Sequence, residues 1–384
     1  WDNGQWDQGR SGNASVADPR GVFWKYNGNG STDVMRFSVF TGLNDIVISN
    51  DSEVGLPGSG QDLRSEAAAS VYNPGSIISR LGSGATTVRT GNSESNGGSG
   101  SITVNVPIDY DPLSSNQSLA MNAAGNLTIN AAISDSNPGS PVNLNLTLGS
   151  HSPLIAGSTS DGAMTIAAPI NLTAGSFTAS GTTFNNTSGP ITSGAASLNF
   201  TGSAQINAAM SVSSLSTSSG SLAVNSPVTS SGAVNLTSTG AISLASTVTG
   251  TAVTIASSTL TVSSPLTASS NLSLTTSGQM TIDGAVSGQD VTINANGLTT
   301  TASITAAGAF SLTNSGASSL GAPISAGSLN ISSTLDLEGD LQVSGSLGTG
   351  GTLNILSGGS LTVGTLEADT PDLIVDGGTL ALTS

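Results

Sequence analysis

From about residue 196 onward, short apolar-x-apolar pairs recur along the chain, bounded by Ser, Thr, Asn and Gly. Within each unit a second pair such as Ile242/Leu244 follows, and then a single apolar residue such as Val248. An alternation with a period of two residues indicates a strand with one buried face. The strongest pair returns at equal intervals, at Val234/Leu236, Val253/Ile255, Leu272/Leu274, Val291/Ile293, Phe310/Leu312 and Leu329/Ile331. The pattern therefore predicts three short strands in each 19-residue period.

This period predicts a parallel β-solenoid. Three strands joined by about two to five residues leave no room for a helix, and a β-propeller blade needs about 40 to 45 residues. Stacking each coil on the next places equivalent strands about 4.8 Å apart and buries the apolar pairs in one narrow core. We expect an all-β, three-sided parallel β-helix, right-handed by the general preference of parallel crossovers.

The pattern is less regular toward the N-terminus. We divide the chain into an N-terminal β-rich cap or docking segment at residues 1–110 and a β-solenoid at 111–384. The solenoid has irregular coils at 111–195 and regular 19-residue coils at 196–384, and we expect longer loops around Asn137-Pro138-Gly139 and at 150–161. No polar cap closes the last coil, which predicts that the chain continues beyond Ser384 or stacks on another molecule there.

The composition fits a stacked repeat, with 8% charged residues, 3% aromatic residues, 49 Gly and no Cys. Stacking in register places identical side chains about 4.8 Å apart, which penalises charges but lets Asn or Thr bond to its own copy. A net charge of −16 argues against nucleic acid or an anionic membrane as a partner. No apolar stretch is long enough to cross a bilayer, and Trp1 in first place suggests that a secretory signal has been removed.

Basic and aromatic side chains gather at the N-terminus, where all seven Lys and Arg residues lie before position 90. We interpret this segment as a cap over the first coil, with strands at 23–26 and 37–40. A docking surface for an export partner or for a neighbouring copy is an alternative, and exposed aromatic residues that bind a sugar are a third. The candidate docking residues are Trp1, Trp6, Phe23, Trp24, Tyr26, Phe37 and Phe40.

Little in the sequence points to catalysis. His151 is the only His, which argues against a Ser-His-Asp triad and, with no Cys, against a zinc site. No Arg or Lys follows Arg89, which argues against a polysaccharide lyase. Thr residues are scattered along the chain, which argues against a Thr-x-Thr face that binds ice. We therefore expect no enzyme activity, no catalytic residue and no cofactor.

Two acidic groups remain as candidates for binding or hydrolysis. We interpret them as solvated surface residues, with a calcium site or the carboxylate pair of a glycoside hydrolase as alternatives. Leu335 and Leu337 should point inward, which places the neighbouring carboxylates on the outer face, about 7 Å apart. The two groups are Asp336, Glu338 and Asp340, and Glu367, Asp369, Asp372 and Asp376.

The coils at 252–256 (AVTIA), 308–316 (GAFSLTNSG) and 327–331 (GSLNI) resemble repeats of filamentous haemagglutinin-like exoproteins of Gram-negative bacteria, whose repeat has a similar period. The resemblance covers about residues 110–384. It implies secretion by the two-partner route, through an outer-membrane partner, and a role in adhesion, biofilms or contact-dependent interaction. The segment 73–78 (NPGSII) matches the Asn-Pro-Asn-Gly-Ile export motif of that family only in part.

Together these observations predict a secreted or cell-surface bacterial β-solenoid without enzyme activity. It would act as a stalk, adhesin or filament subunit whose copies stack head to tail. Its expected partners are another copy, an outer-membrane export protein or a surface glycan. The alternative is a carbohydrate-active β-helix enzyme, either a lyase or a hydrolase.

Overall fold

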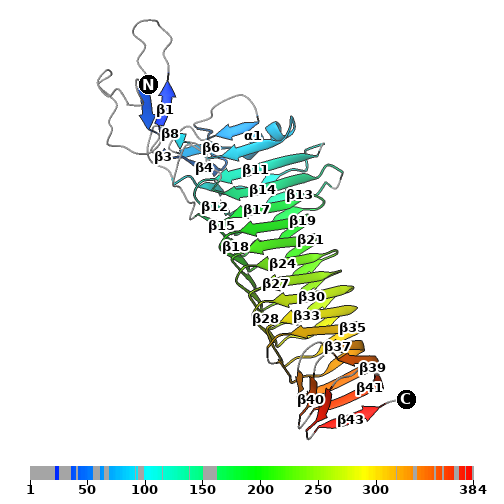
Figure 1. Cartoon of the computed structure of the whole chain (residues 1–384). Helices are drawn as coiled ribbons and strands as arrows, with labels where there is room; N and C mark the ends of the chain where they lie inside the picture. Colours follow the sequence, from blue (N-terminus) through cyan, green and yellow to red (C-terminus); the bar gives the residue numbers. More distant parts are fainter. Residues whose placement is uncertain are drawn as a thin grey trace. The chain divides into compact units, whose positions relative to one another are not determined.

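A computed structural model gives the structure of this chain (Figure 1). It describes residues 22–25, 36–39, 42–54, 61–64, 69–90, 92–93, 99–114, 116–137, 139–149, 162–316, 318–331, 335–349, 352–356, 359–366, 372–376 and 378–382. The chain forms two compact units: Trp1–Leu172 with Ala179–Thr182, and Thr173–Thr178 with Thr183–Ser384. Both consist mainly of parallel strands, which confirms the predicted β-solenoid.

In its described residues the first unit has three parallel ladders and two antiparallel strand pairs. The antiparallel pairs are β1 (Val22–Lys25) with β2 (Arg36–Val39), and β3 (Gly42–Leu43) with β8 (Asn92–Ser93). One ladder joins β6 (Ala69–Tyr72), β4 (Asp45–Ile48), β9 (Ile102–Val104), β12 (Leu127–Ile129) and β15 (Ala163–Ile166). The others join β5 (Asp62–Arg64), β7 (Thr86–Arg89), β11 (Gln117–Ala123) and β14 (Val142–Leu148), and β10 (Ile108–Asp109), β13 (Ile133–Asp135) and β16 (Ile170–Leu172).

A helix that the sequence reasoning did not predict, α1 (Pro74–Leu81), lies in the first unit. The Asn73 side chain accepts a hydrogen bond from Gly75 N at 2.9 Å, and Pro74 follows in the first turn. Asn at the N-cap followed by Pro is a strong helix start. Ile77 and Leu81 are buried, and α1 packs against β7, β10 and β11. The segment that partly matches an export motif is therefore the start of this helix.

The described part of the second unit forms three ladders, which we name A, B and C. Ladder C joins β18 (Thr183–Asn186), β20 (Ser203–Ile206), β22 (Ser221–Val224), β25 (Ala241–Leu244), β28 (Thr259–Val262), β31 (Gln279–Ile282), β34 (Gly297–Thr300), β36 (Ser318–Leu320), β38 (Leu335–Leu337), β40 (Thr352–Ile355) and β42 (Asp372–Val375). Ladder A joins β23 (Val228–Ser230), β26 (Val248–Gly250), β29 (Leu266–Ala268), β32 (Val286–Gly288) and β43 (Thr379–Leu382) with the first residues of several long strands.

Ladder B joins β24 (Val234–Ser238), β27 (Val253–Ser257), β30 (Asn271–Thr276) and β33 (Asp290–Ala295) with the later residues of the same long strands. Figure 1 shows these four strands one above another. The strands that run from ladder A into ladder B are β19 (Ile191–Phe200), β21 (Met210–Ser219), β35 (Ile304–Asn314), β37 (Ile324–Ile331), β39 (Asp340–Thr349) and β41 (Ser360–Leu366). Strand β17 (Phe177–Gly181) has residues in both units.

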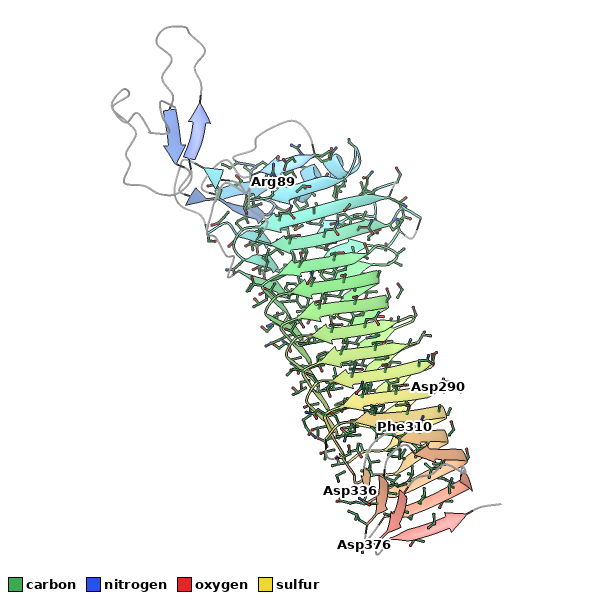
Figure 2. All side chains as sticks on the ribbon, viewed as in Figure 1. Arg89, Asp290, Phe310, Asp336 and Asp376 are labelled. Carbon is green, nitrogen blue, oxygen red and sulfur yellow. The ribbon has the colours of Figure 1, made fainter. Side chains whose placement is uncertain are left out.

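The apolar pairs fill the core as predicted. In ladder B the inward column Val234, Val253, Leu272, Val291 and Phe310 is exposed by no more than 1%. Figure 2 labels Phe310 on its strand. Three strands per coil and inward apolar pairs are thus confirmed, while the handedness stays a prediction.

The predicted 19-residue period holds in ladder B but is modulated in the other two. In ladder A, Val228 pairs with Val248, Val248 with Leu266, and Leu266 with Val286. The sequence separation between partners is therefore longer, then shorter, then longer again. In ladder C the partners Leu222, Ile242, Leu260, Met280 and Leu298 alternate in the same way. The true structural period of the region 210–318 is therefore a pair of coils.

The alternation arises at the two corners that flank ladder B. From ladder A to ladder C the chain runs from Val228 to Ile242 in one coil, and by a shorter path from Val248 to Leu260 in the next. We call these wide and narrow coils. The ladder B segments of the wide coils start at 234, 272 and 310, and those of the narrow coils start at 215, 253 and 291.

Glycines that recur at every second coil build the wide corners: Gly202, Gly240, Gly278 and Gly316. A Cβ at Gly240 or Gly316 would collide with a carbonyl oxygen of the preceding coil, and one at Gly278 would lie 2.9 Å from the Ser258 carbonyl oxygen. The buried Ser238 side chain stabilises its corner. Its hydroxyl accepts a hydrogen bond from Gly240 N at 3.1 Å and donates one to the Gly220 carbonyl oxygen at 3.0 Å.

Candidate functional site

Three of the seven predicted docking residues lie on the antiparallel pair β1–β2, where Phe23 is opposite Ser38 and Trp24 is opposite Phe37. Trp1, Trp6, Tyr26 and Phe40 lie outside the described residues. The backbone thus brings the Trp24 and Phe37 positions together across two strands. Docking by these residues stays a prediction.

The first acidic group lies on and beside β38, where two of its three carboxylates bond to the following coil. Asp336 Oδ1 accepts from Asn354 Nδ2 at 2.8 Å, and Asp340 Oδ1 accepts from Ser360 Oγ at 2.5 Å. Glu338 is exposed, and Leu337 is buried as predicted. In Figure 2, Asp336 lies on the opposite side of the ribbon from Asp290. Both bonded carboxylates therefore serve coil stacking.

The second acidic group is described only in part. Asp372 begins β42, Asp376 follows it and is exposed, and Glu367 and Asp369 lie outside the described residues, as does His151. Among the residues that the structure describes, no three His, Cys, Asp or Glu side chains are grouped so that they could hold a metal ion. The calcium alternative therefore has no observation in its favour.

In the first unit, charged side chains hold individual coils together. Arg89 donates to both carboxylate oxygens of Asp62, with Nε to Oδ1 at 2.8 Å and Nη2 to Oδ2 at 2.6 Å. Asp45 Oδ1 accepts from the backbone N–H groups of Ser99 and Ser101, at 2.8 and 2.9 Å. These contacts join segments that are distant in the sequence, which indicates a structural role.

Asp135 is a buried carboxylate, 1% exposed, at the end of β13. Its oxygens accept from Asn137 N at 3.1 Å and from Val142 N at 2.8 Å, so it closes the predicted longer turn around residues 137–139. The Tyr110 hydroxyl is fully buried in the adjacent coil and has no hydrogen-bond partner in the described part of the chain. Burial raises the pKa of Tyr110, and the negative charge of Asp135 raises it further, so the phenol stays neutral.

The second unit carries long columns of uncharged polar side chains instead. One column of ladder A pairs Thr229 with Thr249, Thr267, Ser287 and then Thr305. These hydroxyl residues are scattered in the sequence but lie in register in the fold. A Thr-x-Thr array needs two neighbouring columns of Thr on one face, so this single column does not form one.

Asn side chains on ladder C and at the corner after it also bond from coil to coil. Asn207 Nδ2 donates to Asn185 Oδ1 at 2.7 Å, and Asn225 Nδ2 donates to Asn207 Oδ1 at 2.7 Å. Asn207 and Asn225 follow paired residues and are equivalent, which confirms that a stacked Asn side chain can bond to its copy, whereas Asn185 is paired with Gln205. Asn207 both donates and accepts, so these amides bond to one another across three coils.

An uncharged polar surface lies on the outer side of ladder B. We define face B by its two central columns, in which all twelve side chains are exposed or half-buried and none is charged. The columns are Ser216, Asn235, Thr254, Ser273, Thr292 and Ser311, and Ser218, Thr237, Ala256, Thr275, Asn294 and Thr313. Around it, residues 162–282 contain no Asp, Glu, Lys, Arg or His at all.

No family model, no curated protein and no solved structure gives a significant match to this chain. The resemblance to filamentous haemagglutinin-like exoproteins therefore rests on the repeats alone. In the described part of the chain, no helix has the length and apolar character needed to cross a membrane.

Proposed function

We propose that this chain is a structural β-solenoid of the cell surface or the extracellular space, acting as a stalk, adhesin or filament subunit. One observation carries the proposal. From β20 to β37, consecutive strands are joined by only one to three residues. Catalytic and ligand-binding groups usually lie on longer loops held by a scaffold. A surface made of short corners and strand ladders instead suits a protein that acts as a spacer or that presents a surface to a partner.

The chemistry of that surface supports an extracellular role. A stretch without titratable side chains, such as residues 162–282, keeps the same charge whatever the external pH. Its strands are stabilised by backbone ladders and small apolar residues, neither of which needs an ion pair. Tolerance of a changing medium is useful to a secreted protein.

The partners that we propose follow from the N-terminal segment and from the repeats. The aromatic residues Phe23, Trp24 and Phe37 would dock an export partner, a surface glycan or another copy. The likeness of the repeats to those of two-partner-secreted exoproteins supports an outer-membrane export partner.

Protease digestion of intact producing cells, followed by immunodetection of this chain, tests the location. We expect the protein in the medium or on the cell surface, where added protease removes it. A protein found only after lysis would contradict the proposal. Beads coated with the purified chain should adhere to a cell or matrix surface better than beads coated with albumin.

The enzyme alternative is tested separately. The triple variant Asp336→Asn, Glu338→Gln, Asp340→Asn is compared with the wild type and with the control Asp283→Asn in assays on neutral and acidic polysaccharides. We expect no turnover by any of the proteins. Turnover by the wild type and the control that the triple variant loses would refute the structural proposal.

A further inference from the structure

Face B differs from an ordinary protein surface in both charge and side-chain size. About 25 to 35% of a typical designed soluble surface is charged, whereas the twelve central positions of face B carry no charge and no side chain larger than Asn. Ser, Ala and Thr lose little rotamer freedom when they become ordered. A partner can therefore cover face B without burying a charge and at a low entropic cost.

Two rows of corners border face B, and both alternate with the two-coil period. The residue just before each ladder B segment is exposed in the wide coils, at Ala233, Asn271 and Ala309. In the narrow coils the equivalent residues Ser214, Ala252 and Asp290 are half-buried. The border is thus raised at one coil and recessed at the next. The pattern repeats about every 9.6 Å along the stacking direction, which is the length of two coils.

The opposite border repeats the alternation. Wide corners expose Thr239 and Ser277 just before Gly240 and Gly278, whereas the narrow corner between them has Ser258 half-buried. One border charge, Asp290, already accepts a hydrogen bond from Ala309 N at 2.8 Å. The borders therefore restrict any occupant of face B to positions that repeat every second coil.

A partner that matches this spacing over six coils must itself repeat at two coils. A second copy of this chain has that period by construction, and its raised corners meet the recessed ones when it runs antiparallel, with the two-fold axis between two coils. Small stacked side chains on parallel strands can also interdigitate closely, as they do in steric zippers. From these observations we infer that face B pairs with face B of a second copy.

The size of face B is sufficient for such a dimer. Six coils at about 4.8 Å and about six residues at 3.3 Å give about 600 Å² for each copy, or about 1,200 Å² in total. Specific interfaces begin at about 1,000 to 1,200 Å². The same patch on both copies makes the contact isologous, so it closes as a dimer and does not continue as a fibre.

This pairing deepens the proposed structural role and rests on it, but the two can fail separately. A protein found at the cell surface that stays monomeric refutes the pairing alone. A dimer found inside cells refutes the location alone.

Sedimentation equilibrium of the 384-residue chain over a wide concentration series tests the pairing. The double variant Asn235→Glu, Ser273→Glu places two charges in the centre of face B. The matched control Thr229→Glu, Thr267→Glu places two charges on ladder A with the same exposed and half-buried classes. We expect a wild-type dimer, at least a tenfold weaker dimer for the face B variant, and an unchanged control. Circular dichroism should show that both variants are folded.

A second measurement uses the absence of Cys from the chain. Thr254→Cys on face B should form disulfide-linked dimers under mild oxidation, whereas Thr249→Cys on ladder A should form them far more slowly. A wild type that is monomeric at every concentration would overturn the inference. So would equal weakening of the dimer, or equal cross-linking, by the face B variants and their ladder A controls.

Discussion

The two units reach the same kind of fold by different means. In the first unit individual contacts hold the coils: Arg89 with Asp62, the Asp45 carboxylate with two N–H groups, and buried Asp135 in a long turn. From β20 to β37 in the second unit, alternating wide and narrow coils are joined by corners of one to three residues, and residues 183–282 carry no charge. The comparison teaches that contacts of charged side chains gather where the coils are irregular, whereas the regular coils rely mainly on uncharged side chains and backbone repetition.

The substitution with the largest expected effect on this comparison is Asp135→Ala in the first unit. The substitution leaves two backbone N–H groups, of Asn137 and Val142, without their acceptor. We expect a loss of about 3 kcal/mol in the free energy of unfolding, because both bonds are made to a buried carboxylate. Urea denaturation combined with hydrogen exchange of the β13 and β14 amides measures the loss.

The control for Asp135→Ala is Asp109→Ala, which removes an exposed carboxylate from the preceding coil. It should change the free energy of unfolding by less than about 0.5 kcal/mol. Equal effects of the two substitutions would show that the first unit does not depend on its buried contact.

An intermediate effect is expected for Gly240→Ala in the second unit. The new methyl group would meet the Gly220 carbonyl of the neighbouring coil, so the wide corner must shift. We expect a loss of about 1 to 2 kcal/mol, typical of overpacking. Gly321→Ala is the control, since its Cβ would approach only the Thr300 carbonyl, at 3.1 Å. If thermal denaturation ranks the control as the more damaging change, backbone spacing at the wide corners is not what restricts them.

The smallest expected effect is a loss of stability at low pH. Hydrogen bonds from the Ser136 side chain and backbone lower the pKa of Asp111 below its usual value. Its contribution to stability is therefore present above the pKa of the unfolded chain, about 3.9, and is lost as the pH falls through the lower folded value. Hydrogen exchange between pH 7 and 3, corrected for intrinsic rates, should show lower protection around residues 111–136 and none of this change at 203–282.

The variant Asp111→Asn should reduce the acid response near Ser136. Acid-induced loss of protection throughout 203–282 would mean that the charge-free coils depend on a titrating group elsewhere in the chain.

The repeat was enough to predict the architecture, because the apolar alternation and the length of each coil leave few alternatives. Helix α1 was missed although Asn73-Pro74 is a good start signal, because the segment was compared with a motif. The role of Asp135 could not be predicted, since a carboxylate beside Asn137-Pro138-Gly139 looks like an ordinary turn residue until the fold points it inward. The two-coil spacing of Gly202, Gly240 and Gly278 was present in the sequence. It was hidden by the apolar pairs of ladder B, which recur evenly at every coil.

The wide and narrow coils also restrict how such a chain can change in length. Each coil of the region 210–318 has a neighbour of the other kind on either side, and Gly240 and Gly278 of wide corners lie close against the corner of a narrow coil. Gain or loss of a single coil would place two corners of the same kind together. Gain or loss of a wide coil together with a narrow one keeps the alternation, so in this region we expect an engineer to insert or remove coils in pairs.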